Sequence, residues 1–146
     1  MKAHFGVTDL LWPLIQAIFS VAAYFLIVLL IRIVNYLVKS TLLTGIVDTL
    51  FGLLYVIFLL ALVSSYANHF RKISGLSITV PFLLSLSITI IIYFLTRLFD
   101  DINKLVGAQF LTEITTFMQD KLVYIFLAIV GVSYIVALAR AEQFRK

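Results

Sequence analysis

Four long runs of apolar residues dominate the pattern of the chain, and each is about as long as a bilayer-spanning helix requires. Leu14–Ile31 contains no charged residue, and at about 1.5 Å of rise per residue such a helix nearly crosses a hydrocarbon core. Trp12 and Pro13 precede it, and they suit a membrane interface and the first turn of a helix respectively. The pattern predicts transmembrane helices over approximately residues 13–38, 44–65, 77–97 and 121–140.

The segment between the third and fourth runs, residues 98–120, has a different pattern. Its apolar residues recur every three or four positions and polar residues fill the positions between them, as on an amphipathic helix. We expect this helix to lie in the membrane interface or to extend the fourth span, although Gly107 weakens it in the middle. The predicted fold is an all-α polytopic membrane protein with four transmembrane helices, packed as a four-helix bundle, plus one amphipathic interfacial helix. Residues 1–146 form a single membrane domain.

The first two predicted spans do not match the last two residue by residue, so we expect no internal repeat. Many transporters are built from inverted repeats that leave a weak internal symmetry in the sequence. The sequence therefore does not support a transporter of that kind.

Composition sharpens the class. The chain is 63% hydrophobic and 12% charged, whereas a soluble domain has roughly 45–50% apolar and about 25% charged residues. A soluble fold and a disordered chain are both excluded. Cysteine is absent, which excludes disulfides, thiolate metal sites and cysteine nucleophiles. The net charge of +4 is scattered and forms no basic stripe, so we expect no binding to nucleic acid.

The distribution of lysine and arginine predicts the orientation. With four spans, both termini and the loop near residues 66–76 lie on one side of the membrane. That side carries six basic residues against five on the other, and basic residues favour the cytoplasmic side. We expect cytoplasmic termini. The high share of Leu, Ile and Phe with few Gly and Ala indicates a bacterial or organellar origin, and the bacterial cell (inner) membrane is the expected location.

Three charged residues intrude into or border the apolar runs. Arg32 lies about seven residues before the first turn and Asp48 about seven after it, so an antiparallel hairpin places them at similar depth and able to pair. Arg97 reaches the same side from the third span. A charge in lipid costs about 2.5–3.5 kcal/mol on insertion scales, and pairing or access to water lowers that cost. The cluster is interpreted either as an ion or proton pathway or as a structural ion pair at the interface.

Polar side chains also recur along the spans at intervals of about four residues. Facing stripes of this kind would line a wet path, but small and hydroxyl residues are equally the ordinary contacts between membrane helices. The residues of this candidate polar path are Gln16, Ser20, Tyr24, Tyr55, Ser85, Thr89 and Tyr93.

The sequence contains no catalytic or metal-binding motif. The two histidines, His4 and His69, have no partner at ligand spacing, and there is neither a Gly-rich phosphate loop nor a G-x-S-x-G turn. We therefore expect no enzyme activity, no catalytic residue, no bound metal and no cofactor.

The favoured hypothesis for function follows from size, because four short-looped helices enclose little space for a pathway of their own. It is a small non-enzymatic integral membrane protein that acts as a subunit or accessory protein of a membrane assembly. Its expected partners are the lipid bilayer and either further copies of the chain or other membrane-protein subunits. The alternative is a channel or transporter subunit in which Arg32, Asp48 and Arg97 form a charged vestibule.

Overall fold

The computed structural model describes residues 6–73 and 75–143, and within these ranges helices are the only regular secondary structure. Long apolar runs explain this, because a helix satisfies all its own backbone hydrogen bonds and so tolerates a surrounding without water. The elements are α1 (Val7–Val38), α2 (Thr41–Gly52), α3 (Leu54–Phe70), a short 3-10 helix η1 (Ser77–Thr79), α4 (Val80–Val106) and α5 (Gln109–Gln143).

Three helical stretches are long and apolar enough to cross a membrane. They are Leu10–Val38, Ser77–Val106 and Gln109–Ala139, and α2 with α3 makes a fourth if that bent pair is one span. The prediction of a helical membrane-type chain is thereby confirmed at this coarse level.

The second predicted span is broken near its middle. α2 and α3 meet at Leu53 at an angle of 49°. Gly52, just before the break, is a poor helix former, and Leu53 has φ −91° and ψ 7°, outside the helical range. No bond runs from the Leu54 N–H to the Leu50 carbonyl, as an unbroken helix would require. The Tyr24 hydroxyl of α1 donates to that carbonyl at 3.0 Å instead, so a side chain from the neighbouring helix supplies the hydrogen bond that the break removes.

The structure divides residues 98–120 between two helices, in place of one separate amphipathic helix. α4 continues to Val106, and α5 begins at Gln109 and runs unbroken through the fourth span. Gly107 causes the division, because at φ 71° it adopts the left-handed conformation that glycine readily takes after a helix. The amphipathic pattern therefore belongs to the two arms of a helical hairpin.

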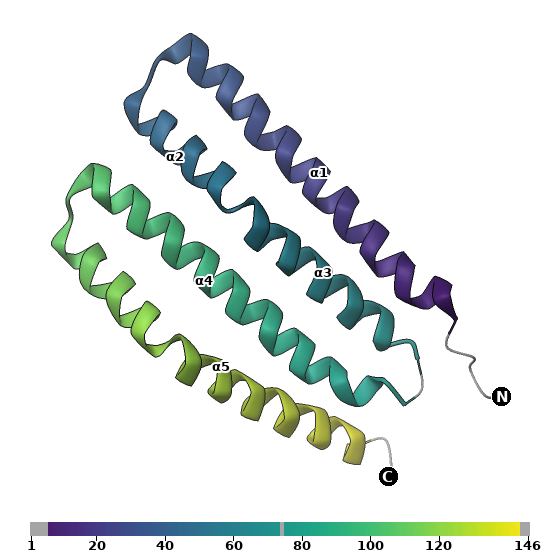
Figure 1. The fold of residues 1–146 in the computed structure, drawn as a ribbon. Coiled ribbons are helices and arrows are strands. Elements are labelled where there is room, and N and C mark those ends of the chain that lie inside the picture. Colours follow the sequence, from purple (N-terminus) through teal and green to yellow (C-terminus); the bar gives the residue numbers. More distant parts are fainter. Residues whose placement is uncertain (1–5, 74, 144–146) are drawn as a thin grey trace.

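The helices form an open layer in chain order (Figure 1). α1 packs on α2 and α3, these pack on α4, and α4 packs on α5. In the part of the chain that the structure describes, α1 contacts neither α4 nor α5, and α3 does not contact α5. The expected four-helix bundle is not formed, since in a bundle the helices enclose a shared core. α5 buries no apolar side chain among its described residues.

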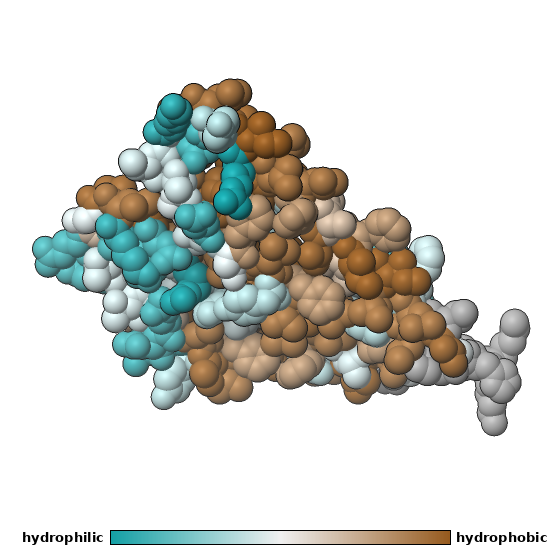
Figure 2. Space-filling view, turned by 45° about the horizontal axis from the view of Figure 1, so that its top comes forward, coloured by the Kyte–Doolittle hydropathy of each residue, from teal (hydrophilic) through white to brown (hydrophobic). Residues whose placement is uncertain are grey.

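The layer has two distinct ends. The turn end holds the connections at 39–40 and 107–108, and the loop end is where α3 ends and α4 begins (Figure 1). Hydrophilic side chains gather at the turn end, while apolar side chains cover most of the remaining surface in the same view (Figure 2). This is the distribution expected of helices that cross a lipid layer and project one end from it.

The second hairpin, α4 with α5, repeats the first at a constant shift along the chain. Asn35 Nδ2 donates to Thr44 Oγ1 at 2.8 Å, and Asn103 Nδ2 donates to Thr112 Oγ1 at 2.6 Å. Each asparagine Oδ1 also accepts the backbone N–H five positions ahead, at 3.2 and 2.8 Å. The two sets lie 68 positions apart, 35 to 103 and 44 to 112. Both hairpins therefore close with the same side-chain bonds.

The same shift relates contacts at the loop end. The Tyr66 hydroxyl donates to the Leu10 carbonyl at 2.7 Å, and the Tyr134 hydroxyl donates to the Ile78 carbonyl at 3.1 Å. These pairs are again 68 positions apart, 10 to 78 and 66 to 134. The correspondence thus extends over the full length of each hairpin.

The expectation that the chain has no internal repeat is wrong. At this register residues 35–46 read NYLVKSTLLTGI and residues 103–114 read NKLVGAQFLTEI, with the capping asparagine and threonine retained. Along the spans the match is weaker, because apolar side chains that face outward interchange with little effect on packing. The repeat is parallel, since a two-helix unit returns the chain to the side on which it began.

Candidate functional site

A polar pocket of about 320 Å³, which we call the charged pocket, lies in the half of the layer nearer the turn end, beside the break between α2 and α3. α2, α3 and α4 all contribute to it. Its lining is Asp48, Thr49, Gly52, Leu53, Tyr55, Arg97 and Asp101.

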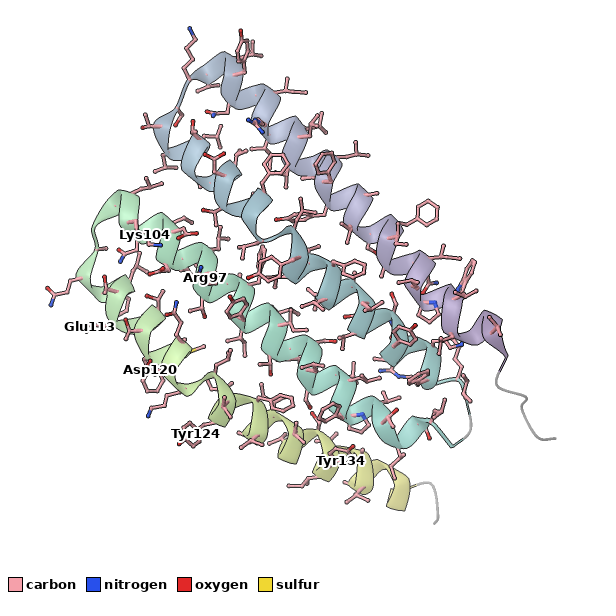
Figure 3. All side chains as sticks on the ribbon, viewed as in Figure 1. Arg97, Lys104, Glu113, Asp120, Tyr124 and Tyr134 are labelled. Atoms are coloured by element: carbon pink, nitrogen blue, oxygen red, sulfur yellow. The ribbon has the colours of Figure 1, made fainter. Side chains whose placement is uncertain are left out.

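Hydrogen bonds connect the pocket to the end of α4. The Thr49 hydroxyl donates to Asp101 Oδ2 at 3.2 Å, which ties α2 to α4. Lys104 Nζ lies 2.6 Å from Asp101 Oδ1 and 3.2 Å from Asp100 Oδ2, at the (i, i+3) and (i, i+4) spacings of a helix. Asp101 therefore has a partner on each side. Arg97 and Lys104 project from α4 at the same end of the layer as Glu113 and Asp120 of α5 (Figure 3).

The structure brings two of the three predicted charges to this pocket and leaves the third outside. Asp48 and Arg97 both line it, and both are exposed. The guanidinium of Arg32 instead lies over the ring of Phe51, 5.5 Å from its centroid, as a cation–π contact. Neither Arg32 nor Arg97 forms an ion pair with Asp48. The predicted pair fails because Asp48 points to the seam with α4, whereas Arg32 meets the α1 side of α2.

The residues of the candidate polar path do not share one path. Gln16 and Ser20 are exposed on α1, and the Ser20 hydroxyl donates to the Gln16 carbonyl of its own helix at 2.9 Å. Ser85 is fully buried and bonds to Ser133 of α5 at 3.0 Å, and the Thr89 hydroxyl donates to the Ser85 carbonyl at 2.9 Å. These hydroxyls therefore join helices or bond to their own helix.

Three tyrosines of that set lie at or near the break. Tyr24 bonds to the broken helix, and the hydroxyls of Tyr55 and Tyr93 lie 3.3 Å apart across the α3–α4 seam. Tyr55 borders the charged pocket and also a smaller apolar pocket of about 170 Å³ that contains Tyr93 and Thr89. The tyrosine pair thus separates a polar cavity at the turn end from an apolar one deeper in the layer.

The charged pocket has no counterpart in the second hairpin. α5 passes the corresponding level without a break. At the shift of 68 positions that relates the hairpins, Tyr24, Asp48 and Gly52 correspond to Ile92, Thr116 and Asp120. The break, the tyrosine that satisfies it and the adjacent acid are therefore present together in one hairpin and absent together from the other.

The chemistry available in the pocket is electrostatic. It combines two carboxylates, one guanidinium and hydroxyl groups, with the Lys104 ammonium next to it. Over residues 6–73 and 75–143, no group of three His, Asp or Glu side chains is arranged to hold a metal ion. Such a pocket can retain water and small ions or exchange protons, and it can also make charged contacts with another protein.

Sequence reasoning missed several residues of this region. Asp101 and Thr49 join α2 to α4, and Asn35 and Asn103 close the two hairpins. Each asparagine stands six residues before the start of the next helix and nine before a threonine, and this recurrence would have revealed the repeat.

Comparison of the chain with protein-family models, with curated proteins and with solved structures finds no match.

Proposed function

We propose that the chain is a non-enzymatic integral membrane protein that acts as a subunit or accessory protein of a membrane assembly. The observation that supports it is the open layer, in which α1 and α5 do not meet and no interior is enclosed among the described residues. A pathway or site in such a layer needs another surface to complete it. The partners are lipid and either further copies of the chain or other membrane-protein subunits.

The position of the partner follows from the two edges of the layer. Inside the molecule, polar pairs join the hairpins: Thr49 with Asp101, Tyr55 with Tyr93, and Ser64 with Ser87. The repeat-equivalent positions on the free edges of α1 and α5 are all large, apolar and exposed: Phe19, Phe25, Ile33, Phe117, Val123 and Val132. Because acyl chains are as apolar as these side chains, the edges suit lipid. We therefore place the protein partner against the exposed charges near the break.

In this proposal the protein has four spans, with α2 and α3 as one broken span. The termini lie on the cytoplasmic side of a bacterial cell membrane, as the sequence count of six basic residues on the side of the termini against five on the other side favours.

Cross-linking tests the assembly and its geometry together. The chain lacks cysteine, so a single cysteine can carry a photo-reactive group without background labelling. Asp48→Cys, beside the break, should cross-link to a partner, and the matched control Phe19→Cys on the α1 edge should not. Samples extracted directly into lipid nanodiscs are then analysed by native mass spectrometry. A monomer without a co-purifying protein under several mild conditions would contradict the proposal.

The broken helix favours a second candidate, a channel or transporter subunit with Asp48 and Arg97 on the pathway. Interrupted helices beside polar groups are where transporters bind substrates and ions, and parallel repeats occur among transporter folds. Arg32, the third member of the predicted vestibule, would stabilise the turn end through Phe51.

Ion flux into proteoliposomes separates this candidate from the first. Asp48→Asn and Arg97→Gln should each reduce flux, while Asp120→Asn, at the position that corresponds to Gly52, should leave it unchanged. Flux that is unaffected by the first two changes would remove those residues from the mechanism. Complete absence of flux, with the assembly intact, would exclude the channel class.

A further inference from the structure

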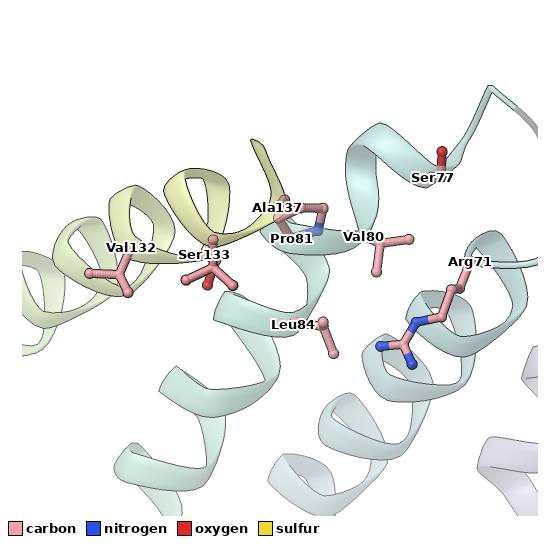
Figure 4. A pocket seen from close by; sticks show the side chains of 9 residues that line it. Arg71, Ser77, Val80, Pro81, Leu84, Val132, Ser133 and Ala137 are labelled. Atoms are coloured by element: carbon pink, nitrogen blue, oxygen red, sulfur yellow. The ribbon is translucent and has the colours of Figure 1, made fainter. Parts of the chain in front are cut away.

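A second pocket lies at the loop end, far along the layer from the charged pocket, and has a volume of about 500 Å³. The end of α3, the start of α4 and the last part of α5 surround it (Figure 4). Its lining is Arg71, Ser77, Val80, Pro81, Leu84, Val132, Ser133, Val136 and Ala137. Two hydroxyls and one cation therefore border a cavity whose other residues are apolar.

The internal repeat allows the lining of this pocket to be compared with that of the corresponding pocket in the first hairpin. The first hairpin forms a pocket at the same end, of about 350 Å³, lined by Trp12, Gln16, Asn68, His69, Arg71 and Lys72. At the shift of 68 positions its first four residues correspond to Val80, Leu84, Val136 and Ala137. Equivalent positions are thus largely polar in one hairpin and aliphatic in the other. The fold alone does not dictate the apolar lining.

Arg71 supplies the charge. Its side chain reaches from the end of α3 toward the start of α4 (Figure 4). Arg71 is exposed and forms no ion pair with another side chain among the residues that the structure describes. Because it borders both pockets, and Lys72 borders the first, positive charge is concentrated where the two meet. An anionic ligand would balance the positive charge of Arg71 and Lys72 at this position.

The depth of the pocket matches a lipid headgroup region. Ser77 begins one candidate span and Ala139, two residues beyond Ala137, ends another. Arg71 directly follows the last residue of α3, Phe70, and its side chain borders the pocket, whose aliphatic residues extend along the helices from these ends. A basic pocket between membrane helices with apolar walls is the arrangement that binds the headgroups of anionic lipids.

We propose that the pocket formed by α3, α4 and α5 binds one anionic phospholipid, with its phosphate at Arg71 and an acyl chain along Val80, Leu84 and Val136. Arginine suits this role because its guanidinium binds phosphate through two parallel N–H donors. A zwitterionic lipid would bring a choline cation close to the guanidinium together with its phosphate, and a free phosphate would leave the aliphatic lining without a partner. Both chemistries are satisfied together only by an anionic amphiphile.

Native mass spectrometry of the full-length chain, purified without added lipid, tests the proposal. Phosphatidylglycerol and phosphatidylcholine with identical acyl chains are titrated in parallel. We expect one phosphatidylglycerol to bind about tenfold more tightly, because the choline cation of phosphatidylcholine is repelled by the Arg71 guanidinium and offsets part of the attraction of its phosphate. Arg71→Gln should abolish this preference. Leu84→Gln, which introduces the residue of the first hairpin, should weaken binding of both lipids.

Two controls distinguish the site from general surface charge and from a phosphate site. Lys72→Gln removes a neighbouring cation outside this pocket and should leave the tenfold preference in place. Inorganic phosphate at the same concentration should not displace the lipid. Equal binding of the two lipids, equal effects of Lys72→Gln and Arg71→Gln, or displacement by inorganic phosphate would each overturn the proposal. Ala137→Phe, which fills the cavity, provides a second test of the acyl position if Leu84→Gln fails to fold.

Discussion

Single residues decide where the hairpins turn. Lys39 and Gly107 end the first helix of each hairpin at φ 53° and 71°, and one capping asparagine precedes each of them. Only glycine adopts this conformation without steric cost, so the two turns reach the same geometry with different strain. The side-chain bonds of the asparagines make that geometry the same in both hairpins.

Gly107→Ala should reduce the free energy of unfolding by about 1 kcal/mol, because a Cβ is strained at positive φ although no atom lies within 4 Å of it. Gly131→Ala is the matched control, since it also meets no atom within 4 Å but lies inside α5. There the change should stabilise by about 0.5–1 kcal/mol through helix propensity. Reversible unfolding in mixed micelles measures both values. The same sign for both changes would contradict this account of the turn.

Asn103→Ala should destabilise more than Asn35→Ala. Asn103 is buried, and its loss leaves the Ala108 N–H and the Thr112 hydroxyl without that partner. The Asn103 side chain is itself shielded from water and its two hydrogen bonds are shorter than those of the half-exposed Asn35, so Asn103→Ala loses bonds for which water competes less. The same unfolding measurement tests the order, with the exposed Thr116→Ala as a control expected to change stability by less than about 0.5 kcal/mol. Equal losses at the two asparagines would show that burial is not the deciding factor.

At the scale of elements, the break between α2 and α3 has both a local and a tertiary cause in the first hairpin. Its local cause is Gly52 and its tertiary support is the Tyr24 hydroxyl, which takes the place of the missing backbone bond. α5 has Asp120 at the corresponding position, no tyrosine opposite it, and no break. The broken helix places Asp48 and Tyr55 on the walls of one pocket.

Gly52→Ala should straighten the α2–α3 junction, because alanine favours the helix by about 1 kcal/mol and its Cβ meets no atom within 4 Å. Spin labels on cysteines at the exposed positions Leu42 and Asn68 report the change as a longer distance between the two ends. Tyr24→Phe in the same background should lengthen it further, since the hydroxyl no longer competes for the Leu50 carbonyl. A distance that stays constant in both variants would show that packing against α1 and α4 alone maintains the bend.

At the scale of the molecule, two equivalent hairpins lie side by side and polar contacts hold their seam. Three such contacts join α2 and α3 to α4. Because lipid provides no hydrophobic force that would drive helices together, these contacts and close packing determine how the hairpins associate. Close packing is visible at Gly45, where a Cβ would lie 2.6 Å from Leu105 Cδ1.

The triple variant Thr49→Val, Tyr55→Phe, Ser64→Ala should weaken the seam by about 2 kcal/mol, taking roughly 0.6 kcal/mol for each interhelical hydrogen bond. The matched control changes three exposed apolar side chains on the free edges: Phe19→Leu, Ile33→Leu and Val123→Ile. We expect the control to unfold within about 0.5 kcal/mol of the parent chain for each change. A seam variant as stable as the control would mean that van der Waals packing alone joins the hairpins.

The sequence by itself determined that the chain is helical and apolar enough to cross a membrane, because helix length and hydropathy are local properties. The sequence also indicated that Arg32, Asp48 and Arg97 lie at similar depth, since the distance of a residue from the turn sets its depth in a helical hairpin. Which of these charges meet was not a local property. It depends on how each helix is rotated against its neighbours, and that rotation directs Asp48 toward α4 and Arg32 toward Phe51.

Only the tertiary structure decided the open layer and the broken second span, and it made the repeat recognisable. An apolar side chain on a membrane helix suits contact with lipid as well as contact with another helix, so hydropathy does not distinguish a layer from a bundle. The repeat is visible where hydrogen bonds demand particular side chains, as at Asn35 and Asn103, and is obscured where any apolar residue suffices. The tertiary structure also decided the pocket at Arg71, because residues of α5 that are far along the sequence from Arg71 and the start of α4 complete it.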